Sequence, residues 1–324
     1  MKNRLWTRNY TLLMTATTLG CIGGIAGGYA LSLLVFDETR STLASAIVLA
    51  IQIVPGFLMP LLLAPWMDRM PRKPFLVGGD VLNGVLYAGA GVYLLLFRFS
   101  YVGYLCFSLL LATLSSFDQL AYNSIYPKLI PVGMEQKGYA VSAMLYPVIQ
   151  VLIMPVAAAL YELFGVGLLL IGQGTLSLLA ALIESRISIH EEKRLTEKRY
   201  TIRLWWQDIR EVGRYFQKEK GLRGLYAYMA VTNGVASGYG PVITAFFRTA
   251  PGLSMVLYSF FSVAEFAGRT VAGLLQYTVK IPAKRRFAMI FGVYQVYETM
   301  DMCLLWLPYP LMLVNRCLLY TSDA

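Results

Sequence analysis

The chain has 324 residues, of which 57% are hydrophobic and 14% charged, and its formal net charge is +10. So few charged residues could not cover the surface of a soluble domain of this size, which excludes an ordinary soluble protein. The positive charge does not predict a nucleic-acid partner, because lysine and arginine of a membrane protein gather on one side of the bilayer. We therefore expect an all-α, polytopic membrane protein embedded in a lipid bilayer.

Apolar stretches long enough to cross a bilayer recur along the whole chain. Most of the 28 lysine and arginine residues fall in the inner segments when the N-terminus is placed inside, so we predict a cytoplasmic N-terminus. The stretches predict nine membrane-spanning helices, at about residues 9–36, 41–66, 75–97, 100–122, 139–161, 164–184, 222–247, 254–278 and 287–307.

A charged loop separates the second and third predicted spans. Residues 68–73 read Asp-Arg-Met-Pro-Arg-Lys, which is more charge than a reversal of direction requires. A similar basic stretch with a proline, residues 280–286, follows the eighth predicted span. Repeated loops of this kind are typical of transporters built from two related halves. We interpret the first loop as a cytoplasmic loop with a specific function.

The middle of the chain differs from the rest in composition. Residues 185–221 mix charges of both signs and contain an amphipathic stretch at 204–216. We interpret this segment as a solvated linker whose helix lies on the inner membrane surface, and a regulatory or partner-binding arm remains the alternative. The predicted domains are thus an N-terminal bundle at 1–184, this linker, and a second bundle at 222–315. Residues 316–324 turn abruptly polar, and we interpret them as a non-native tail.

Several short motifs resemble those of the major facilitator superfamily of transporters. The family signature is a loop after the second helix that reads Gly-x-x-x-Asp-Arg-x-Gly-Arg-Lys. Residues 125–131 resemble the corresponding loop of macrolide-efflux-like members, and residues 154–159 resemble the Gly-Pro-x-x-Gly-Gly motif of drug:proton antiporters. The signature is matched by Asp68, Arg69, Arg72 and Lys73, with Ala64 and Pro71 in place of its two glycines.

The resemblance covers about residues 5–310 and implies a fold of twelve helices in two bundles. We therefore expect a complete N-terminal six-helix bundle and a partial C-terminal bundle in a C-terminally truncated chain. The resemblance also implies a multi-pass protein of the bacterial inner (plasma) membrane. It implies proton-coupled export of an amphipathic small molecule by alternating access, in which the two bundles rock around a central site.

The resemblance assigns a cytoplasmic gate to the charged loop. The gate consists of Asp68, Arg69, Arg72 and Lys73, with Asp118 as its acidic partner. Ordinary charges that only set the membrane topology remain the alternative.

Two further sets of residues are candidates. Asp80 lies seven residues after Lys73 on one helix face, where a simple ion pair is the competing interpretation. Glu265 and Arg269 lie near the middle of the eighth span, where they form either a structural pair or a proton or substrate site. The residues predicted to pack helices closely are Gly20, Gly24 and Gly28 in the first span and Pro155 in the fifth.

Motifs for nucleotide hydrolysis, metal binding and enzymatic catalysis do not occur in the sequence. We therefore expect no cofactor, no metal and no enzymatic activity. The expected partners of a monomeric transporter are a small-molecule substrate and protons. Two alternatives stay open: an importer or a carrier of lipids or siderophores from the same superfamily, and a non-transporting membrane scaffold or sensor.

Overall fold

The computed structural model describes residues 5–67, 71–188, 201–253, 255–278, 291–292, 295–296, 299–300 and 303–322. Every regular element within these residues is a helix, which confirms the predicted all-α class. The chain divides into two compact units, one of residues 1–135 and 149–200, the other of residues 136–148 and 201–324. These units divide the chain differently from the predicted domains, whose boundaries stay a prediction.

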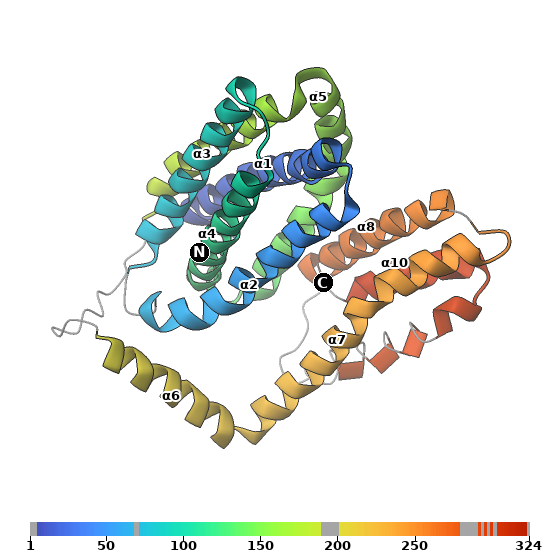
Figure 1. The fold of residues 1–324 in the computed structure, drawn as a ribbon. Helices are drawn as coiled ribbons and strands as arrows, with labels where there is room; N and C mark the ends of the chain where they lie inside the picture. Colours follow the sequence, from blue (N-terminus) through green and yellow to red (C-terminus); the bar gives the residue numbers. More distant parts are fainter. Residues whose placement is uncertain are drawn as a thin grey trace. The chain divides into compact units, whose positions relative to one another are not determined.

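The first unit contains the N-terminal helices. Thr7 Oγ1 accepts a hydrogen bond from the Tyr10 N–H at 3.3 Å, and Ser100 Oγ accepts one from the Gly103 N–H at 3.4 Å. Each side chain thereby satisfies a backbone donor that the first turn of its helix leaves open. The helices are α1 (Arg8–Thr39), α2 (Thr42–Met67), α3 (Lys73–Leu96), α4 (Tyr101–Leu129) and most of α5 (Glu135–Ser185) (Figure 1).

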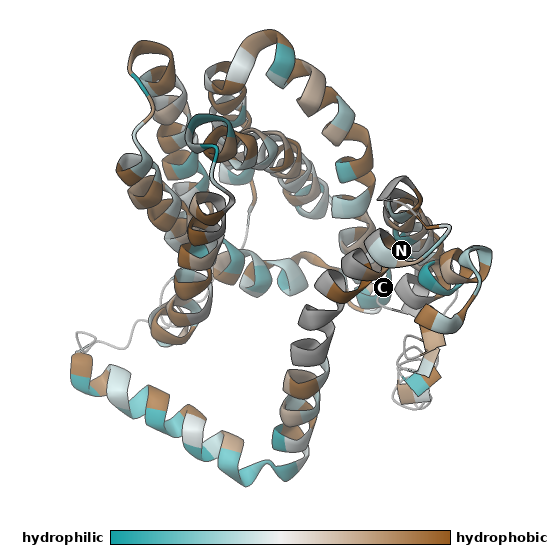
Figure 2. Cartoon of the chain, turned by 45° about the vertical axis from the view of Figure 1, so that its right-hand side comes forward, coloured by the Kyte–Doolittle hydropathy of each residue, from teal (hydrophilic) through white to brown (hydrophobic). Residues whose placement is uncertain are grey.

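These five helices are long and apolar enough to cross a membrane, α2 through residues 50–67. In Figure 2, hydrophobic residues predominate on them. With 51 residues, α5 would be about 75 Å long, more than twice the roughly 30 Å thickness of a bilayer core. Gly165 interrupts it with a φ of 71°, a backbone conformation that glycine adopts easily. The sequence predicts separate spans at 139–161 and 164–184, so the break falls at the start of the second.

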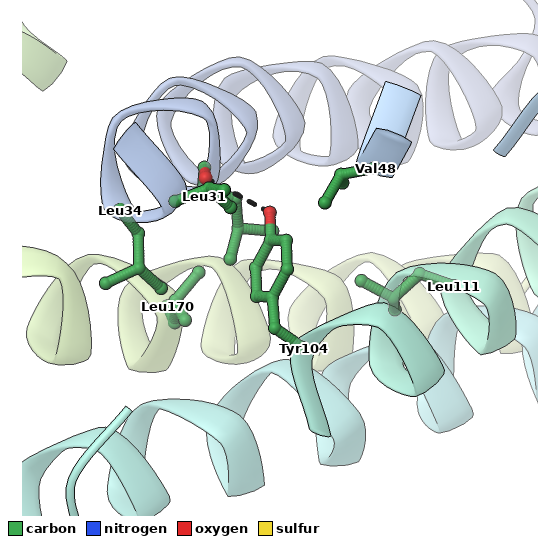
Figure 3. Packing of buried hydrophobic residues seen from close by; sticks show 7 residues of the cluster. Leu31, Leu34, Val48, Tyr104, Leu111 and Leu170 are labelled. Atoms are coloured by element: carbon green, nitrogen blue, oxygen red, sulfur yellow. Dashed lines mark hydrogen bonds between the residues drawn. The ribbon is translucent and has the colours of Figure 1, made fainter. Parts of the chain in front are cut away.

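An apolar core joins α1, α2, α4 and α5. The Tyr104 hydroxyl donates a hydrogen bond of 3.0 Å to the Leu31 carbonyl oxygen within this core (Figure 3). A buried hydroxyl needs such a partner, because an unsatisfied one would cost free energy. The buried members of the core are Leu31, Leu34, Val35, Val48, Tyr104, Leu111 and Leu170.

Glycines allow α3 and α5 to approach closely. Gly84 and Gly91 lie seven residues apart on α3, and Gly167 and Gly174 have the same spacing on α5. A β-carbon on Gly91 would lie 2.5 Å from the Gly167 carbonyl oxygen, and one on Gly174 would lie 2.6 Å from the Gly84 carbonyl oxygen. The two backbones therefore touch at two levels, in the manner of small-residue contacts between membrane helices.

The packing role predicted for Gly20, Gly24 and Gly28 stays a prediction. A neighbouring face of α1 packs against α5, because Gly23 and Gly27 lie directly against Gln173. Pro155 is exposed, and Ala157 is the residue buried at that level of α5. Within the described residues, a β-carbon would meet no atom within 4 Å at Gly20, Gly24 and Gly28.

The second unit has an aromatic core. The Phe247 ring lies 5.0 Å from the Phe261 ring, 5.5 Å from that of Tyr258 and 6.2 Å from that of Tyr309, measured between centroids. The Tyr309 hydroxyl also donates to the Leu257 carbonyl oxygen at 2.9 Å. The helices α8 and α10 lie side by side here (Figure 1). The elements are α6 (Ile202–Lys218), α7 (Lys220–Thr249), α8 (Met255–Thr278), the 3-10 helix η1 (Leu304–Trp306) and α10 (Tyr309–Ser322).

The first residues of α5 pack against α8 in this unit. The Met144 side chain lies directly against Gly273, and the Lys137 ammonium group lies 4.9 Å from the centroid of the Tyr277 ring. Contact with an aromatic face stabilises a cation where water is scarce. These contacts explain why residues 136–148 group with the C-terminal half of the chain.

Candidate functional site

The predicted gate charges are only partly within the described residues. Asp68 and Arg69 lie outside them. Arg72 and Lys73 begin α3, and Pro74 follows in the first turn, where a missing N–H costs no hydrogen bond. The Lys73 ammonium group donates a hydrogen bond of 2.7 Å to the Ser185 carbonyl oxygen at the end of α5. Lysine is well placed there, because carbonyl groups at a helix C-terminus carry partial negative charge.

A second contact closes the same end of the first unit. The Asn9 side chain donates to the Ser188 carbonyl oxygen at 2.7 Å and accepts from the Ser188 N–H at 3.2 Å. These two hydrogen bonds attach the start of α1 to the chain that leaves α5. Lys73 and Asn9 thus hold α3 and α1 to the C-terminal end of α5.

Asp118 lies in a narrow space between α4 and α3. The Asn83 amide donates a hydrogen bond of 2.6 Å to Asp118 Oδ2. Asp118 Oδ1 is buried directly against Gly79 and has no hydrogen-bond partner among the described residues. Any side chain at Gly79 would displace this carboxylate.

Two further acids complete a carboxylate cluster, which consists of Asp80, Asp118 and Glu184. Asp80 and Asp118 both interact electrostatically with Glu184. Only 3% of the Glu184 side chain is exposed, and its Oε2 has no hydrogen-bond partner in the described part of the chain. Acids at such depth are costly unless a cation or a proton neutralises them. Within the described residues, no three His, Cys, Asp or Glu side chains converge as ligands of a metal ion.

The sequence predicted two members of this cluster and missed the third. Asp118 was a candidate as the acidic partner of the gate that the resemblance implies, and Asp80 because it lies seven residues after Lys73 on one helix face. Glu184 lies where an apolar stretch meets the charged linker, and such an acid looks like the first residue of a solvated loop. No local pattern distinguishes it from such a loop residue, because its burial depends on α3 and α4.

A cavity of about 640 Å³ lies in the first unit. Polar but uncharged side chains and aromatic rings alternate with aliphatic groups on its wall, and α4 supplies most of the polar ones. None of its described lining residues carries a charge at neutral pH. The polar and aromatic lining residues are Ser32, Gln52, Tyr87, Tyr104, Ser108, Ser115, Ser116, Gln119 and Asn123.

Backbone acceptors add to the polarity of this wall. Pro60 has no N–H, so the Gly56 carbonyl cannot accept the usual helical hydrogen bond from residue 60. Both residues line the cavity. Ser116 Oγ donates to the Ala112 carbonyl oxygen at 2.9 Å and lies 3.3 Å from that of Pro55. The wall therefore offers hydroxyls, amides and a carbonyl, all without formal charge.

The helix α4 connects the cavity with the carboxylate cluster. Ser116, Gln119 and Asn123 line the cavity, whereas Asp118 lies against Gly79 of α3. Because these residues lie within two turns of one helix, a movement of α4 that displaces Asp118 also moves the cavity wall. This arrangement allows neutralisation of an acid to be coupled to the shape of a binding site.

The candidates of the eighth span lie in the second unit. A nitrogen of the Arg316 guanidinium lies 3.9 Å from Glu265 Oε1, and this guanidinium also lies 5.5 Å from the centroid of the Phe261 ring. The neighbouring Asn315 donates to the Met300 carbonyl oxygen at 3.1 Å. Arg316 is buried, although the sequence placed it in a non-native tail. The predicted pairing of Glu265 with Arg269 stays a prediction.

Comparison with known proteins gives one result of broad coverage. The family model described as Major Facilitator Superfamily matches residues 9–318. No curated protein sequence matches the chain significantly. The matched region includes α1 to α5 with the cavity and the carboxylate cluster, and it includes Glu265 and Arg316 of the second unit.

Proposed function

Because the chain belongs to the Major Facilitator Superfamily, whose members are secondary transporters and not enzymes, we propose that it exports an amphipathic small molecule in exchange for protons. The macrolide-efflux-like subtype, the bacterial plasma membrane and the cytoplasmic N-terminus are parts of this proposal, whereas C-terminal truncation stays a prediction. The observation that carries the proposal is the cavity of about 640 Å³ with no charged residue on its described wall.

The chemistry of the cavity favours an amphipathic substrate without a strong charge. Its volume lies within the range of about 300–1,000 Å³ that holds drug-sized molecules. Hydroxyl and amide groups on the wall can exchange hydrogen bonds with a polar substrate, and the rings of Tyr87 and Tyr104 offer apolar surface. An ion would lose its hydration there without gaining an opposite charge.

The carboxylate cluster supplies the proposed proton site. Asp80 and Asp118, the candidate acids of the third and fourth predicted spans, belong to this cluster. Glu184 is its third member. A proton on the cluster removes repulsion between neighbouring carboxylates, and its release restores that repulsion. Since α4 carries both Asp118 and cavity residues, the energy of the proton gradient reaches the substrate through this helix.

The gate proposal adds the charged loop to this mechanism. Lys73 already joins the start of α3 to the end of α5. We propose that Arg72 and Lys73, together with Asp68 and Arg69, close the cytoplasmic side when the cavity opens outward. Alternating access then requires that these contacts break when the cluster is protonated.

The test is transport by the purified chain in proteoliposomes with an imposed pH gradient. We expect gradient-driven movement of uncharged amphipathic dyes, little movement of dyes with a fixed charge, and loss of transport when a protonophore collapses the gradient. Movement driven only toward the side from which protons flow would support export. Co-movement with protons would favour the importer alternative, and no movement of any dye class would favour the scaffold alternative.

A matched pair of variants tests the cavity itself. Gln119→Leu removes an amide that lines the cavity and donates to Asn123 at 3.1 Å. Thr113→Val removes a hydroxyl on the same helix that donates to the Leu109 carbonyl oxygen and does not line the cavity. We expect Gln119→Leu to raise the KM for the transported dye and Thr113→Val to leave it unchanged. Equal KM values in both variants would contradict the assignment of the cavity as the substrate site.

A further inference from the structure

The helix α6 carries a surface for which the transport mechanism has no use. It is a 17-residue helix with no buried residue. Figure 2 shows hydrophilic and hydrophobic residues alternating along α6. The exposed fractions of its apolar side chains are large, 81% for Ile202, 60% for Trp206 and 62% for Val212. Exposing an apolar surface of this kind to water costs free energy, so the surface suits contact with an apolar environment.

The apolar side chains of α6 form one face. Ile202, Trp206, Ile209, Val212 and Phe216 follow one another at intervals of three or four residues, which is the period of a helix face. The face includes a pair of indole rings, because the Trp205 and Trp206 rings lie 5.3 Å apart. Tryptophan is the residue most typical of the boundary between lipid and water.

A stripe of arginines runs beside this face. Arg210 and Arg214 lie seven and eleven residues after Arg203, a spacing that keeps all three on one side of the helix. The acids Asp208 and Glu211 fall outside this stripe at helical spacing. The positive charge of α6 is therefore concentrated along one flank of the apolar face.

The position of α6 in the chain limits where this surface can lie. Only Glu219 separates α6 from α7, which contains the predicted span 222–247. The Phe216 and Tyr226 rings lie 5.6 Å apart and fix the junction of the two helices. A helix attached this closely to a membrane-spanning segment lies at the level of the lipid headgroups on the side where that segment begins.

From these features we propose that α6 is a binding site for anionic phospholipid headgroups of the cytoplasmic leaflet. The apolar face enters the boundary between headgroups and acyl chains, and Arg203, Arg210 and Arg214 bind the phosphates. The guanidinium group suits this role, because its planar fork matches two phosphate oxygens. Charge complementarity selects this occupant over a zwitterionic surface, since the arginine stripe attracts the negative leaflet.

Amide hydrogen exchange of the whole chain in lipid nanodiscs tests the proposal. The probe is phosphatidylcholine with and without phosphatidylglycerol. We expect slower exchange across residues 202–218 in the discs with phosphatidylglycerol, and loss of this difference at high salt. Each arginine contributes about fivefold to binding, so the triple variant Arg203→Gln, Arg210→Gln, Arg214→Gln should weaken it by roughly 100-fold and abolish the difference.

A control variant removes the same charge outside the stripe. Arg98→Gln, Lys220→Gln and Arg223→Gln should retain most of the slowing, and unchanged exchange in α1 and α4 verifies the fold of both variants. The proposal is overturned if both lipid mixtures give equal exchange, or if the two triple variants behave alike. It is equally overturned if inorganic phosphate reproduces the slowing without phosphatidylglycerol, or if the slowing depends on the number of protein copies per disc.

Discussion

The carboxylate cluster of the first unit and Glu265 of the second unit have different surroundings. Asp118 accepts from the neutral Asn83 amide, and Glu184 is buried with one oxygen that has no hydrogen-bond partner in the described residues. Glu265 instead lies beside the Arg316 guanidinium. A carboxylate with a fixed cation is neutralised permanently, whereas carboxylates beside an amide and each other depend on protons. The carboxylate cluster therefore suits a step that repeats in every cycle, and Glu265 beside Arg316 suits a structural role.

The largest expected effect separates the two sites by function. Glu184→Gln removes a protonatable group from the carboxylate cluster, so we expect flux driven by the pH gradient to fall to the level of liposomes without protein. Glu265→Gln should retain gradient-driven flux in the molecules that remain folded. The measurement is dye transport in proteoliposomes at equal protein content. Normal coupling in Glu184→Gln would rule out the cluster as the proton site.

For the free energy of unfolding, we expect the larger effect at Glu265 and the smaller one at Glu184. Glu265→Gln removes the carboxylate beside the buried Arg316, and we expect a loss of about 2 kcal/mol, because a buried charged group that loses a partner keeps its desolvation cost. Adding Arg316→Met should restore most of the loss, since no charge is then left uncompensated. Thermal unfolding in detergent provides the comparison. If the double variant is less stable than Glu265→Gln, the pair has no structural role.

Glycines bring α3 against α5 in the first unit, whereas aromatic rings fill the core around Phe247 in the second unit. Gly91→Ala places a β-carbon against the Gly167 carbonyl, and we expect it to destabilise the protein by about 2 kcal/mol, as overpacking does. Gly89→Ala is the matched control on the same helix, because a β-carbon there meets nothing within 4 Å. It should be neutral in the same thermal assay. Equal changes of the unfolding temperature in the two variants would mean that helix propensity, and not the contact between α3 and α5, determines the effect.

The smallest effect concerns the hydroxyl in the apolar core. Tyr104→Phe keeps the ring of the core and removes the hydrogen bond to the Leu31 carbonyl, so we expect a loss of about 1 kcal/mol. Tyr101→Phe removes the corresponding bond to the Ala44 carbonyl from a less buried position and should cost less. The two unfolding midpoints give the comparison, and a larger loss in Tyr101→Phe would contradict it.

Much of the fold could be predicted because apolar length decides where helices cross a membrane. The first six predicted spans fall on α1 to α5, two of them on α5, whereas most of the ninth, at 287–307, lies outside the described residues. The face by which a helix packs was harder to predict from the sequence. Two glycine rows run beside each other on α1, and period alone does not distinguish Gly23 and Gly27 from their neighbours, because the choice depends on Gln173 of a distant helix.

Arg316 shows a second limit of the sequence. Its polar surroundings in the chain resemble a departure from the membrane and led to the prediction of a non-native tail, which stays a prediction. In the structure its burial depends on Glu265 and Phe261, about fifty residues earlier in the chain. Contacts between residues so far apart follow from the packing of α8 against α10, which no local pattern encodes. The same holds for Glu184, whose neighbours come from α3 and α4.

The prolines of α2 give this helix a mechanical property of its own. Pro55, Pro60 and Pro65 recur every five residues, and each removes one hydrogen bond from the ladder. Five residues turn a helix by about 140° beyond one full revolution, so the missing bonds fall on different sides. Bending toward any of several directions therefore breaks fewer bonds than in an intact helix. The wall that α2 lends to the cavity is compliant in more than one plane, as a site that must fit substrates of different outline requires.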